Sequence, residues 1–548
     1  MAHALAGKPV QEQDIIDVQT IVDAYFDNVP DMTNPTQLVS FGTSGHRGTS
    51  VDGTFTDLHV AAITQAICDG RKQFGATGPI FVGQDTHALS QPALVTVLEV
   101  LAGNGVTAMV DCDMAFVPTP SVSRAIIRYN EEHDDKADGI IITPSHNPPD
   151  NGGIKYNTII GGPADTVVTK WIEMRANEYL TAYCESEDFK RISIDNIEPT
   201  AQVPYDYKGL YVEELGDVIN MEAIKAAGPK VLVDTLGGSG ASYWNAIKER
   251  YGLDLTIIHD DYDPTFSFMT YDHDGKVRMD CSSTYVMASV INRIGDFDLA
   301  VGNDPDYDRY GIVVSSGLIS ANIFLTLAAS YLFTTRGWKN KGVGKTVVCT
   351  TMIDKWAADA ETPVFEVPVG FKYFSQLLFD GAIGIGGEES AGASFLKKDG
   401  TVWTTDKDGM IMALLSMEIM AVMGKSALKM TDEFVEEFGN PSFGRIDAPC
   451  KKEQKQILKQ MSAELITATT VDGDPITNIR TTSLYNDMPI DGVRVETDKG
   501  WFVARPSGTE DLYKIYGESY KGDLGLVALL TAGEEIVNAA LNGTIETE

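Results

Sequence analysis

Short runs of apolar residues alternate with longer segments of helical periodicity along most of the chain, and glycine-rich turns separate them. "PIFVGQD" (79–85), for example, precedes the helix-like "SQPALVTVLEVLAGNG" and a second apolar run, "VTAMVDC". The runs "KVLVDTLGGSG", "FDLAVGNDPDYDR" and "KTVVCTTM" begin similar units. Continuous apolar strands between helices are typical of mostly parallel sheets. Because the unit recurs at roughly the length of one domain, about 100 residues, the first 440 residues predict three α/β domains of like topology.

The pattern changes after about residue 440. A polar helix, "KKEQKQILKQMSAELI", is followed by the short strands "DGVRVETDKG", "WFVARPSG" and "YKIYGES", and then by the apolar helix "GLVALLTAGEEIVNAAL". This order predicts a smaller α+β domain with an antiparallel sheet. We therefore expect an α/β protein whose domains span residues 1–205, 206–320, 321–440 and 441–548.

The charge balance narrows the choice of partners. Lysines and arginines number 43 and aspartates and glutamates 78, so the net charge is −35. Nucleic acid is excluded as a partner, because binding it requires clustered basic residues. The most apolar window, "MIMALLSMEIMAVMG", is short and contains Glu418, which favours a buried helix over a membrane span. The amino terminus lacks a secretory pattern, so a cytoplasmic protein without membrane contact is expected.

The stretch "IITPSHNPPDNGGIKYN" places Ser145 directly after an apolar strand and beside His146. A serine in this position most often caps a helix or lies in a turn. An acyl-transfer serine would stand in a GxSxG elbow, which is absent here. Because neighbouring side chains usually diverge, His146 is a poor base for Ser145. If Ser145 is a reactive group, another part of the chain must activate it.

A second stretch, "VGNDPDYDRYG", holds Asp304, Asp306 and Asp308 directly after a predicted strand. Alternate residues of an extended chain point to the same side. Three carboxylates on one side repel one another unless a cation neutralises them. Hard oxygen ligands in a small loop favour Mg²⁺. The alternative is a solvated acidic loop or an Asx turn.

The stretch "RPSGTEDLYKIYGES" combines a guanidinium, two hydroxyls and a flexible glycine in Arg505, Ser507, Gly508 and Thr509. Such a turn can direct backbone N–H groups and hydroxyls at one phosphate. A surface hairpin turn is the alternative interpretation.

Two further stretches carry weaker signals. "GGEESAGASF" holds Glu388 and Ser390 after an apolar strand, which suits hydrogen bonding to a sugar and equally a plain helix cap. "FGTSGHRG" holds Arg47 in a glycine-rich turn, which turn chemistry alone would explain.

The five motifs occur in the order found in the α-D-phosphohexomutases, and the chain resembles that family from roughly residue 40 to 520. The resemblance implies four domains around a central cleft, three of similar topology and a smaller fourth. It also implies one Mg²⁺ per chain, held by Asp304, Asp306, Asp308 and an oxygen of Ser145.

The resemblance further implies roles for individual residues. Ser145 would carry the phosphoryl group, with Arg47 and Arg309 supplying positive charge and with Lys155 and His146 transferring protons. The residues that would contact substrate are Gly370, Phe371, Glu388, Ser390, Lys407, Arg505, Ser507, Gly508, Thr509 and Lys514. The chain departs from some relatives at two of these positions: Phe371 replaces a histidine proposed as a proton carrier, which favours Lys155 as the base, and Lys514 replaces an arginine.

The implied reaction interconverts glucose 1-phosphate and glucose 6-phosphate through phospho-Ser145 and glucose 1,6-bisphosphate. The alternatives are the mannose and glucosamine mutases of the same family, and a metal-dependent sugar phosphatase. The expected partners are small sugar phosphates, and the chain is expected to be a monomer or a homodimer.

Overall fold

The computed structural model describes residues 2–42, 45–184, 189–506 and 512–545. The chain divides into two compact units, and each is described by itself. The first unit comprises Met1–Ala321, Phe374–Gly381 and Ser390–Leu428; the second comprises Asn322–Tyr373, Ala382–Glu389 and Lys429–Glu548.

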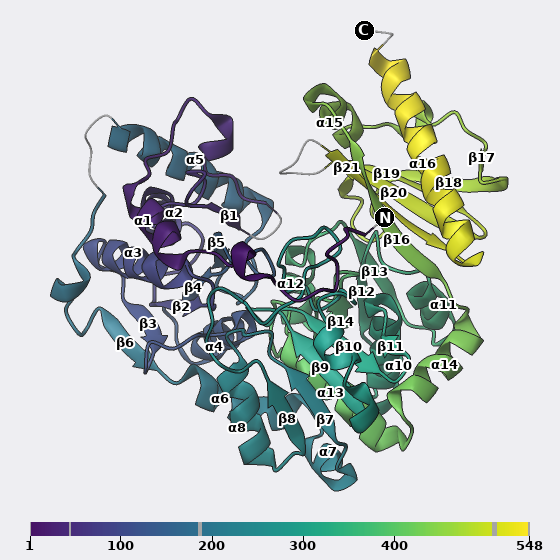
Figure 1. Ribbon diagram of the computed structural model, residues 1–548, viewed down its shortest axis with the longest axis horizontal. Coiled ribbons are helices and arrows are strands. Elements are labelled where there is room, and N and C mark those ends of the chain that lie inside the picture. Colours follow the sequence, from purple (N-terminus) through teal and green to yellow (C-terminus); the bar gives the residue numbers. More distant parts are fainter. Residues whose placement is uncertain (1, 43–44, 185–188, 507–511, 546–548) are drawn as a thin grey trace. The chain divides into compact units, whose positions relative to one another are not determined.

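A six-stranded sheet of order β1-β5-β4-β2-β3-β6 forms the amino-terminal part of the first unit (Figure 1). Its strands are β1 (His46–Thr49), β2 (Ile80–Gln84), β3 (Ala108–Asp111), β4 (Asp138–Ile142), β5 (Asn151–Asn157) and β6 (Gln202–Tyr205). The strands β2, β3, β4 and β6 are parallel, and β5 runs antiparallel to both of its neighbours, β4 and β1.

Helices cover both faces of this sheet. They are α1 (Val18–Asp27), α2 (Asp57–Gly70), α3 (Ser90–Gly103), α4 (Thr119–Glu132) and α5 (Thr166–Cys184). Ile80 and Val82 of β2 pack with α2, α3 and α5, whereas Phe81 between them packs with α4. Since both faces are covered, every residue of β2 and β4 is buried, and the predicted α/β architecture is confirmed.

The first unit contains a second sheet, which has five strands in the order β11-β10-β9-β7-β8. Its strands are β7 (Val231–Asp234), β8 (Leu255–Ile258), β9 (Leu299–Asn303), β10 (Tyr310–Val314) and β11 (Gly317–Leu318). The associated helices are α6 (Tyr207–Val218), α7 (Met221–Ala227), α8 (Ala241–Tyr251), α9 (Ala288–Ile291) and α13 (Gly409–Met423). The predicted buried helix is α13, whose Glu418 accepts a hydrogen bond from the Asn220 backbone N–H at 2.7 Å. The first unit also holds β15 (Ala393–Phe395) and most of α12 (Lys372–Phe379).

Three parallel strands begin the second unit, with β12 (Gly342–Thr346) between β13 (Val364–Val367) and β14 (Ile383–Gly387). The helices here are α10 (Ala321–Arg336), α11 (Met352–Asp359) and α14 (Ala427–Phe438). The strand predicted over "KTVVCTTM" is misplaced, since β12 ends at Thr346. Val347 and Val348 leave the strand because they pack against Trp501 and Val503 in an apolar cluster.

An antiparallel sheet completes the second unit, with order β16-β21-β20-β19-β18-β17. Its strands are β16 (Ser442–Pro449), β17 (Thr470–Val471), β18 (Asp474–Thr482), β19 (Pro489–Thr497), β20 (Gly500–Pro506) and β21 (Leu512–Ser519), and its helices are α15 (Lys452–Lys459) and α16 (Gly522–Ile545). The predicted α+β fold is confirmed. The predicted polar helix is shorter than expected, because Ser462 caps a new turn by accepting from the Glu464 N–H.

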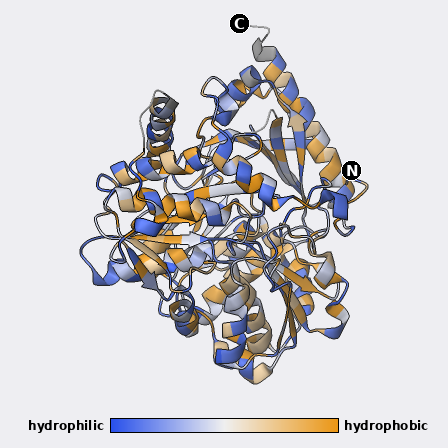
Figure 2. Ribbon diagram, turned by 60° about the vertical axis from the view of Figure 1, so that its left-hand side comes forward, coloured by the Kyte–Doolittle hydropathy of each residue, from blue (hydrophilic) through white to orange (hydrophobic). Residues whose placement is uncertain are grey.

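By length and composition alone, one helix segment in the part of the chain that the structure describes could cross a membrane, Gly522–Asn542 of α16. Figure 2 shows that this helix carries both hydrophobic and hydrophilic residues along its length. Leu526, Leu530, Val537 and Leu541 belong to the core beneath the antiparallel sheet. Packing on that sheet therefore explains these four residues, whereas Leu524 and Val527 of the same helix are exposed.

Candidate active site

Ser145 lies in a tight turn, residues 143–147, that follows β4 and that we call the serine turn. Its φ of 63° is left-handed, a region that costs a non-glycine residue roughly 1–2 kcal/mol. The buried Oγ donates a hydrogen bond to Oδ2 of Asp304 at 3.0 Å, and it lies 3.3 Å from Nδ1 of His146. The fold thus brings Ser145 against an acidic residue 159 positions later in the chain.

The acidic loop, residues 304–308, begins where β9 ends. Asp304, Asp306 and Asp308 are buried, and they offer oxygens that lie within 4.8 Å of one another. The extended backbone assumed from the sequence is wrong: the Tyr307 N–H bonds to the Asp304 carbonyl at 2.9 Å, and Tyr307 has a φ of 63°. A turn, rather than the alternation of a strand, gathers the three carboxylates.

The acidic loop has the features of a cation-binding site. Oδ1 of Asp306 and Oδ1 of Asp308 are buried and have no hydrogen-bond partner. Burial, together with the charges of Asp306 and Asp308, raises the pKa of Asp304 well above its ordinary value. Open oxygens among mutually repelling carboxylates are the arrangement that a hard divalent cation stabilises.

Two lysines partly neutralise the acidic loop. Lys155 Nζ lies 2.6 Å from Asp306 and 3.1 Å from Asp308, and Lys407 Nζ lies 2.9 Å from Asp308. Burial lowers the pKa of Lys155, but Asp306 and Asp308 outweigh it and raise that pKa above its ordinary value. The two carboxylates therefore favour the protonated form of Lys155.

His146 lies within the serine turn, Arg47 contacts that turn and Arg309 follows the acidic loop. Arg47 Nη1 donates to Oδ1 of Asn147 at 3.4 Å, and the Arg309 N–H donates to Oδ1 of Asp304 at 3.0 Å. Burial and the nearby charge of Arg309 place the pKa of His146 well below its ordinary value. The lowered pKa favours the neutral imidazole, whose Nδ1 is the ring atom that faces Ser145 Oγ.

The other predicted substrate-binding residues divide between the units. Ser390 belongs to the first unit, and Gly370, Phe371, Glu388, Arg505 and Lys514 belong to the second. Arg505 on β20 and Lys514 on β21 are directly opposed in register, so two cations stand side by side at one end of the antiparallel sheet. Ser507, Gly508 and Thr509 lie outside the described residues.

Sequence reasoning missed several partners of the site. Thr119, at the start of α4, donates its hydroxyl to Oδ2 of Asp306 at 2.8 Å and its N–H to the Asp306 carbonyl at 2.9 Å. Thr143, Asp85 and His87 form a buried chain of hydrogen bonds behind Ser145. The only sequence signal for these residues is their position at strand and helix ends, which many structural residues share.

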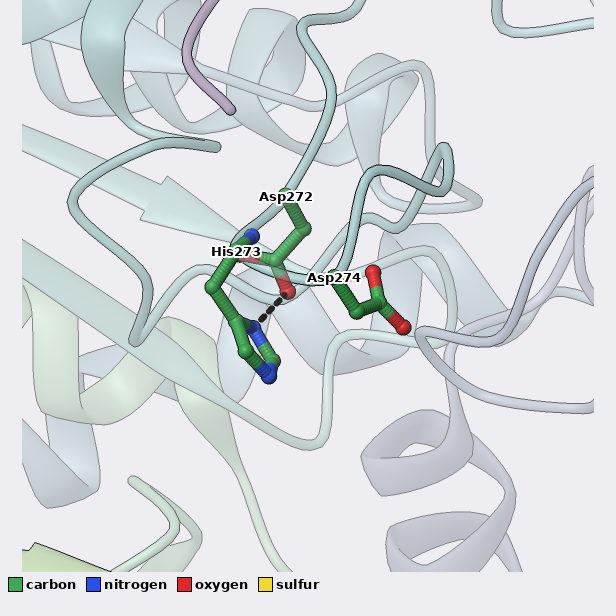
Figure 3. A group of neighbouring side chains, drawn as sticks. All are labelled: Asp272, His273 and Asp274. Carbon is green, nitrogen blue, oxygen red and sulfur yellow. Dashed lines mark hydrogen bonds and ion pairs between the residues drawn. The ribbon is translucent and has the colours of Figure 1, made fainter. Parts of the chain in front are cut away.

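A second acidic group, Asp272, His273 and Asp274, also has metal-ligand geometry (Figure 3). Its carboxylates are already engaged: Asp274 pairs with Arg278 at 2.9 Å, and Asp272 accepts from the His273 backbone N–H at 2.7 Å. His273 and Asp274 are also exposed, so this group resembles an ordinary surface turn.

Comparisons with known proteins agree with this geometry. Sequence models of the phosphoglucomutase/phosphomannomutase family match four consecutive parts of the chain: domain I over residues 38–182, domain II over 210–317, domain III over 320–438 and the C-terminal domain over 447–524. The phosphoglucomutase of Komagataeibacter xylinus is 46% identical over 539 residues, which is 97% of each chain.

Two solved structures share the fold. The open form of the Paramecium phosphoprotein parafusin, a phosphoglucomutase, is 20% identical with a TM-score of 0.72, covering 94% of this chain and 96% of its own. Aspergillus fumigatus N-acetylphosphoglucosamine mutase, in complex with GlcNAc-6P and magnesium, is 15% identical with a TM-score of 0.51, covering 96% and 99%. With Ser145 facing the acidic loop, and with family matches along nearly its whole length, the chain belongs to the phosphoglucomutase/phosphomannomutase family, whose enzymes are isomerases.

Proposed function

We propose that the protein interconverts glucose 1-phosphate and glucose 6-phosphate, with Ser145 as the phosphoryl carrier. The observation that carries the proposal is the buried serine turn, in which Ser145 Oγ meets Asp304 at 3.0 Å beside two open carboxylate oxygens. The 46% identity to a bacterial phosphoglucomutase supports glucose as the sugar.

We further propose that Asp304, Asp306 and Asp308 hold one Mg²⁺ together with an oxygen on Ser145. The donor set fits the ion, since it consists of hard carboxylate oxygens of which two are buried and accept no hydrogen bond. When bound, the ion would neutralise charge on the transferring phosphoryl group. The related Aspergillus mutase was solved with magnesium.

In the first half-reaction, the 6-hydroxyl of glucose 1-phosphate attacks the phosphorus on Ser145. The bond from phosphorus to Ser145 Oγ breaks, a new bond to the 6-oxygen forms, and glucose 1,6-bisphosphate results. The hydroxyl loses a proton and Ser145 Oγ gains one, so an acceptor and a donor are needed. We assign the acceptor role to His146, whose Nδ1 lies 3.3 Å from Ser145 Oγ, and the donor role to Lys155, whose ammonium group bonds to Asp306. Lys155, which the sequence favours as the base, is thus proposed as the proton donor instead.

The second half-reaction returns the 1-phosphate of the bisphosphate to Ser145 and releases glucose 6-phosphate. Phosphoryl transfer has a loose transition state, so positioning and nearby cations supply most of the acceleration. Arg47, Arg309 and Lys407 are proposed as these cations.

The remaining predicted residues are proposed to hold the sugar phosphate. Glu388 and Ser390 would bind sugar hydroxyls, and Gly370 and Phe371 would border the sugar. The non-reacting phosphate would be bound by Arg505, Ser507, Gly508, Thr509 and Lys514. The opposed cations of Arg505 and Lys514 support this assignment, because in a chain of charge −35 two adjacent cations form a local anion site.

We also propose the domain boundaries, the partners and the compartment of the protein. The domain boundaries near residues 205, 320 and 440 are supported by the strands of each sheet, none of which crosses them. Sugar phosphates are the proposed partners, with the chain acting as a monomer or a homodimer. The proposed compartment is the cytoplasm.

A coupled assay tests the function. Glucose 1-phosphate and mannose 1-phosphate are compared as substrates, each with and without glucose 1,6-bisphosphate, and free phosphate is measured in parallel. We expect glucose 6-phosphate to form fastest from glucose 1-phosphate and to depend on the bisphosphate. Preference for mannose 1-phosphate would indicate a phosphomannomutase, and release of free phosphate without isomerisation would indicate a phosphatase.

A further inference from the structure

The serine turn is fixed from behind by a buried hydrogen-bond chain. The Ser145 N–H donates to Oγ1 of Thr143 at 2.7 Å, and the Thr143 hydroxyl donates to Oδ2 of Asp85 at 2.6 Å. All three residues are almost completely buried. Because Thr143 Oγ1 both accepts and donates, only a hydroxyl at this position can link Ser145 to Asp85.

Asp85 in turn is held by residues that follow β2. Its carboxylate accepts four hydrogen bonds: from the His87 N–H at 3.0 Å, His87 Nδ1 at 2.8 Å, the Ser90 hydroxyl at 2.6 Å and Thr143. Burial opposes ionisation of both members of the Asp85–His87 pair, but their attraction outweighs it, so the pKa of Asp85 is lowered and the pKa of His87 is raised. The result is a buried ion pair with fixed geometry.

The same ion pair reaches the far side of Ser145. His87 Nε2 bonds to the Asn147 carbonyl at 3.0 Å. The turn is therefore anchored two residues before and two residues after Ser145, by Asp85 and His87 of one loop. Asn147 also accepts from Arg47 through its side chain, so the second anchor fixes the position of a predicted catalytic cation as well.

We propose that Thr143, Asp85 and His87 are positioning residues, which hold Ser145 in its left-handed conformation with Oγ aimed at the acidic loop. None of the three touches the acidic loop in the contacts described above, so they act through Ser145. A non-glycine residue persists at positive φ only where its surroundings fix it. Without the anchors, Ser145 relaxes towards ordinary backbone angles and its Oγ leaves the line of phosphoryl transfer, where a displacement of about 1 Å costs about 100-fold in rate.

The inference rests on the proposed function of Ser145 and is tested with Thr143→Val, which removes the hydroxyl at nearly constant volume. Thr143→Ser restores the hydroxyl, and Thr64→Val makes the same chemical change at a buried threonine of α2 that bonds only to its own helix. For each variant, kcat and KM with glucose 1-phosphate, the thermal midpoint, and the rate at which glucose 1,6-bisphosphate phosphorylates Ser145 are measured, the last by intact mass.

We expect Thr143→Val to lower kcat and the phosphorylation rate by about 30-fold to 100-fold with KM changed less than about twofold. We expect Thr143→Ser to recover most of that loss, and Thr64→Val to lose stability without losing kcat. Thr143→Val at near wild-type kcat, or Thr143→Ser as slow as Thr143→Val, would overturn the proposal. A wild-type chain that accepts phosphate on Ser145 without isomerising glucose 1-phosphate would refute the proposed function alone, because the phosphorylation rates still test the positioning residues.

Discussion

Two buried networks of charge, one in each unit, differ in how completely their carboxylates are satisfied. In the first unit, the acidic loop leaves Oδ1 of Asp306 and Oδ1 of Asp308 without partners. In the second unit, Glu366, Arg480, Arg494 and Glu496 form a network in which every carboxylate oxygen is used. This second-unit network lines a cavity of about 480 Å³.

In the second-unit network, the arginines donate hydrogen bonds to the glutamates. Arg480 bonds to both oxygens of Glu366 and, at 3.1 Å, to Glu496; Arg494 donates to Glu496 at 2.6 Å and to the Val347 carbonyl. Asn478 donates to the remaining oxygen of Glu496 at 2.9 Å. These bonds join β13 to the antiparallel sheet, as the apolar cluster around Trp501 does. Burial of charge alone therefore does not mark a catalytic site. The acidic loop differs in that two open oxygens come together in one cluster of three carboxylates.

The first prediction removes the proposed carrier. Ser145→Ala should lower kcat by about 10⁴-fold or more, because no other hydroxyl replaces the phosphate acceptor. The thermal midpoint should stay close to that of the wild type, as checked by calorimetry. Ser416→Ala, which removes a buried hydroxyl that bonds within α13, is the control and should keep kcat. Near-normal turnover of Ser145→Ala would contradict the phosphoserine mechanism.

The second prediction concerns the open oxygens. Asp306→Asn should lower kcat by about 10³-fold and weaken Mg²⁺ binding measured by calorimetry, because a carboxylate ligand is lost. Asp274→Asn makes the same change in the second acidic group, whose carboxylates are engaged, and should leave both quantities unchanged. Equal loss of Mg²⁺ binding in the two variants would show that the open oxygens do not distinguish the sites.

The third prediction concerns the satisfied network. Glu366→Gln should lower the free energy of unfolding by about 1.5–3 kcal/mol, because it removes one of the two carboxylates that pair with the buried Arg480 and leaves only Glu496. We expect kcat at low temperature to change little. The measurement is denaturant unfolding, with Asp447→Asn as a control in a pair that is exposed on both sides. A kcat loss larger than the stability loss would mean that this network also serves the reaction.

The fourth prediction is a pH dependence. Burial opposes ionisation of Glu496, but the cations of Arg494 and Arg480 lower its pKa to about 2. Because the folded-state pKa lies below the unfolded value, Glu496 stabilises the fold above pH of about 4.5, and this contribution is lost as the pH falls towards 2. Unfolding free energies measured between these values should fall less steeply in Glu496→Gln. Parallel slopes for variant and wild type would contradict the assignment.

Sequence reasoning found candidate residues that stand in local motifs and missed those whose contacts depend on the fold. Ser145 and the three aspartates stand in short motifs at strand ends, and the structure brings them together. The turn at Tyr307 was missed because a left-handed tyrosine has no sequence signal of the kind that glycine gives. Thr119 and the Asp85–His87 pair were missed because the bonds that tie them to the site span distant segments. The link from Glu366 to Arg480 crosses 114 positions for the same reason, and neither residue carries a motif.

The central claim, that Ser145 carries the phosphoryl group between two sugar oxygens, is tested most directly by following labelled phosphate. The enzyme is incubated with glucose 1,6-bisphosphate labelled in both phosphates, isolated, and then mixed with unlabelled glucose 1-phosphate in a single turnover. The account predicts one label per chain on Ser145 and its transfer to sugar phosphate at a rate no slower than kcat. Label that stays off Ser145, or that leaves it as inorganic phosphate while isomerisation proceeds, would contradict the account.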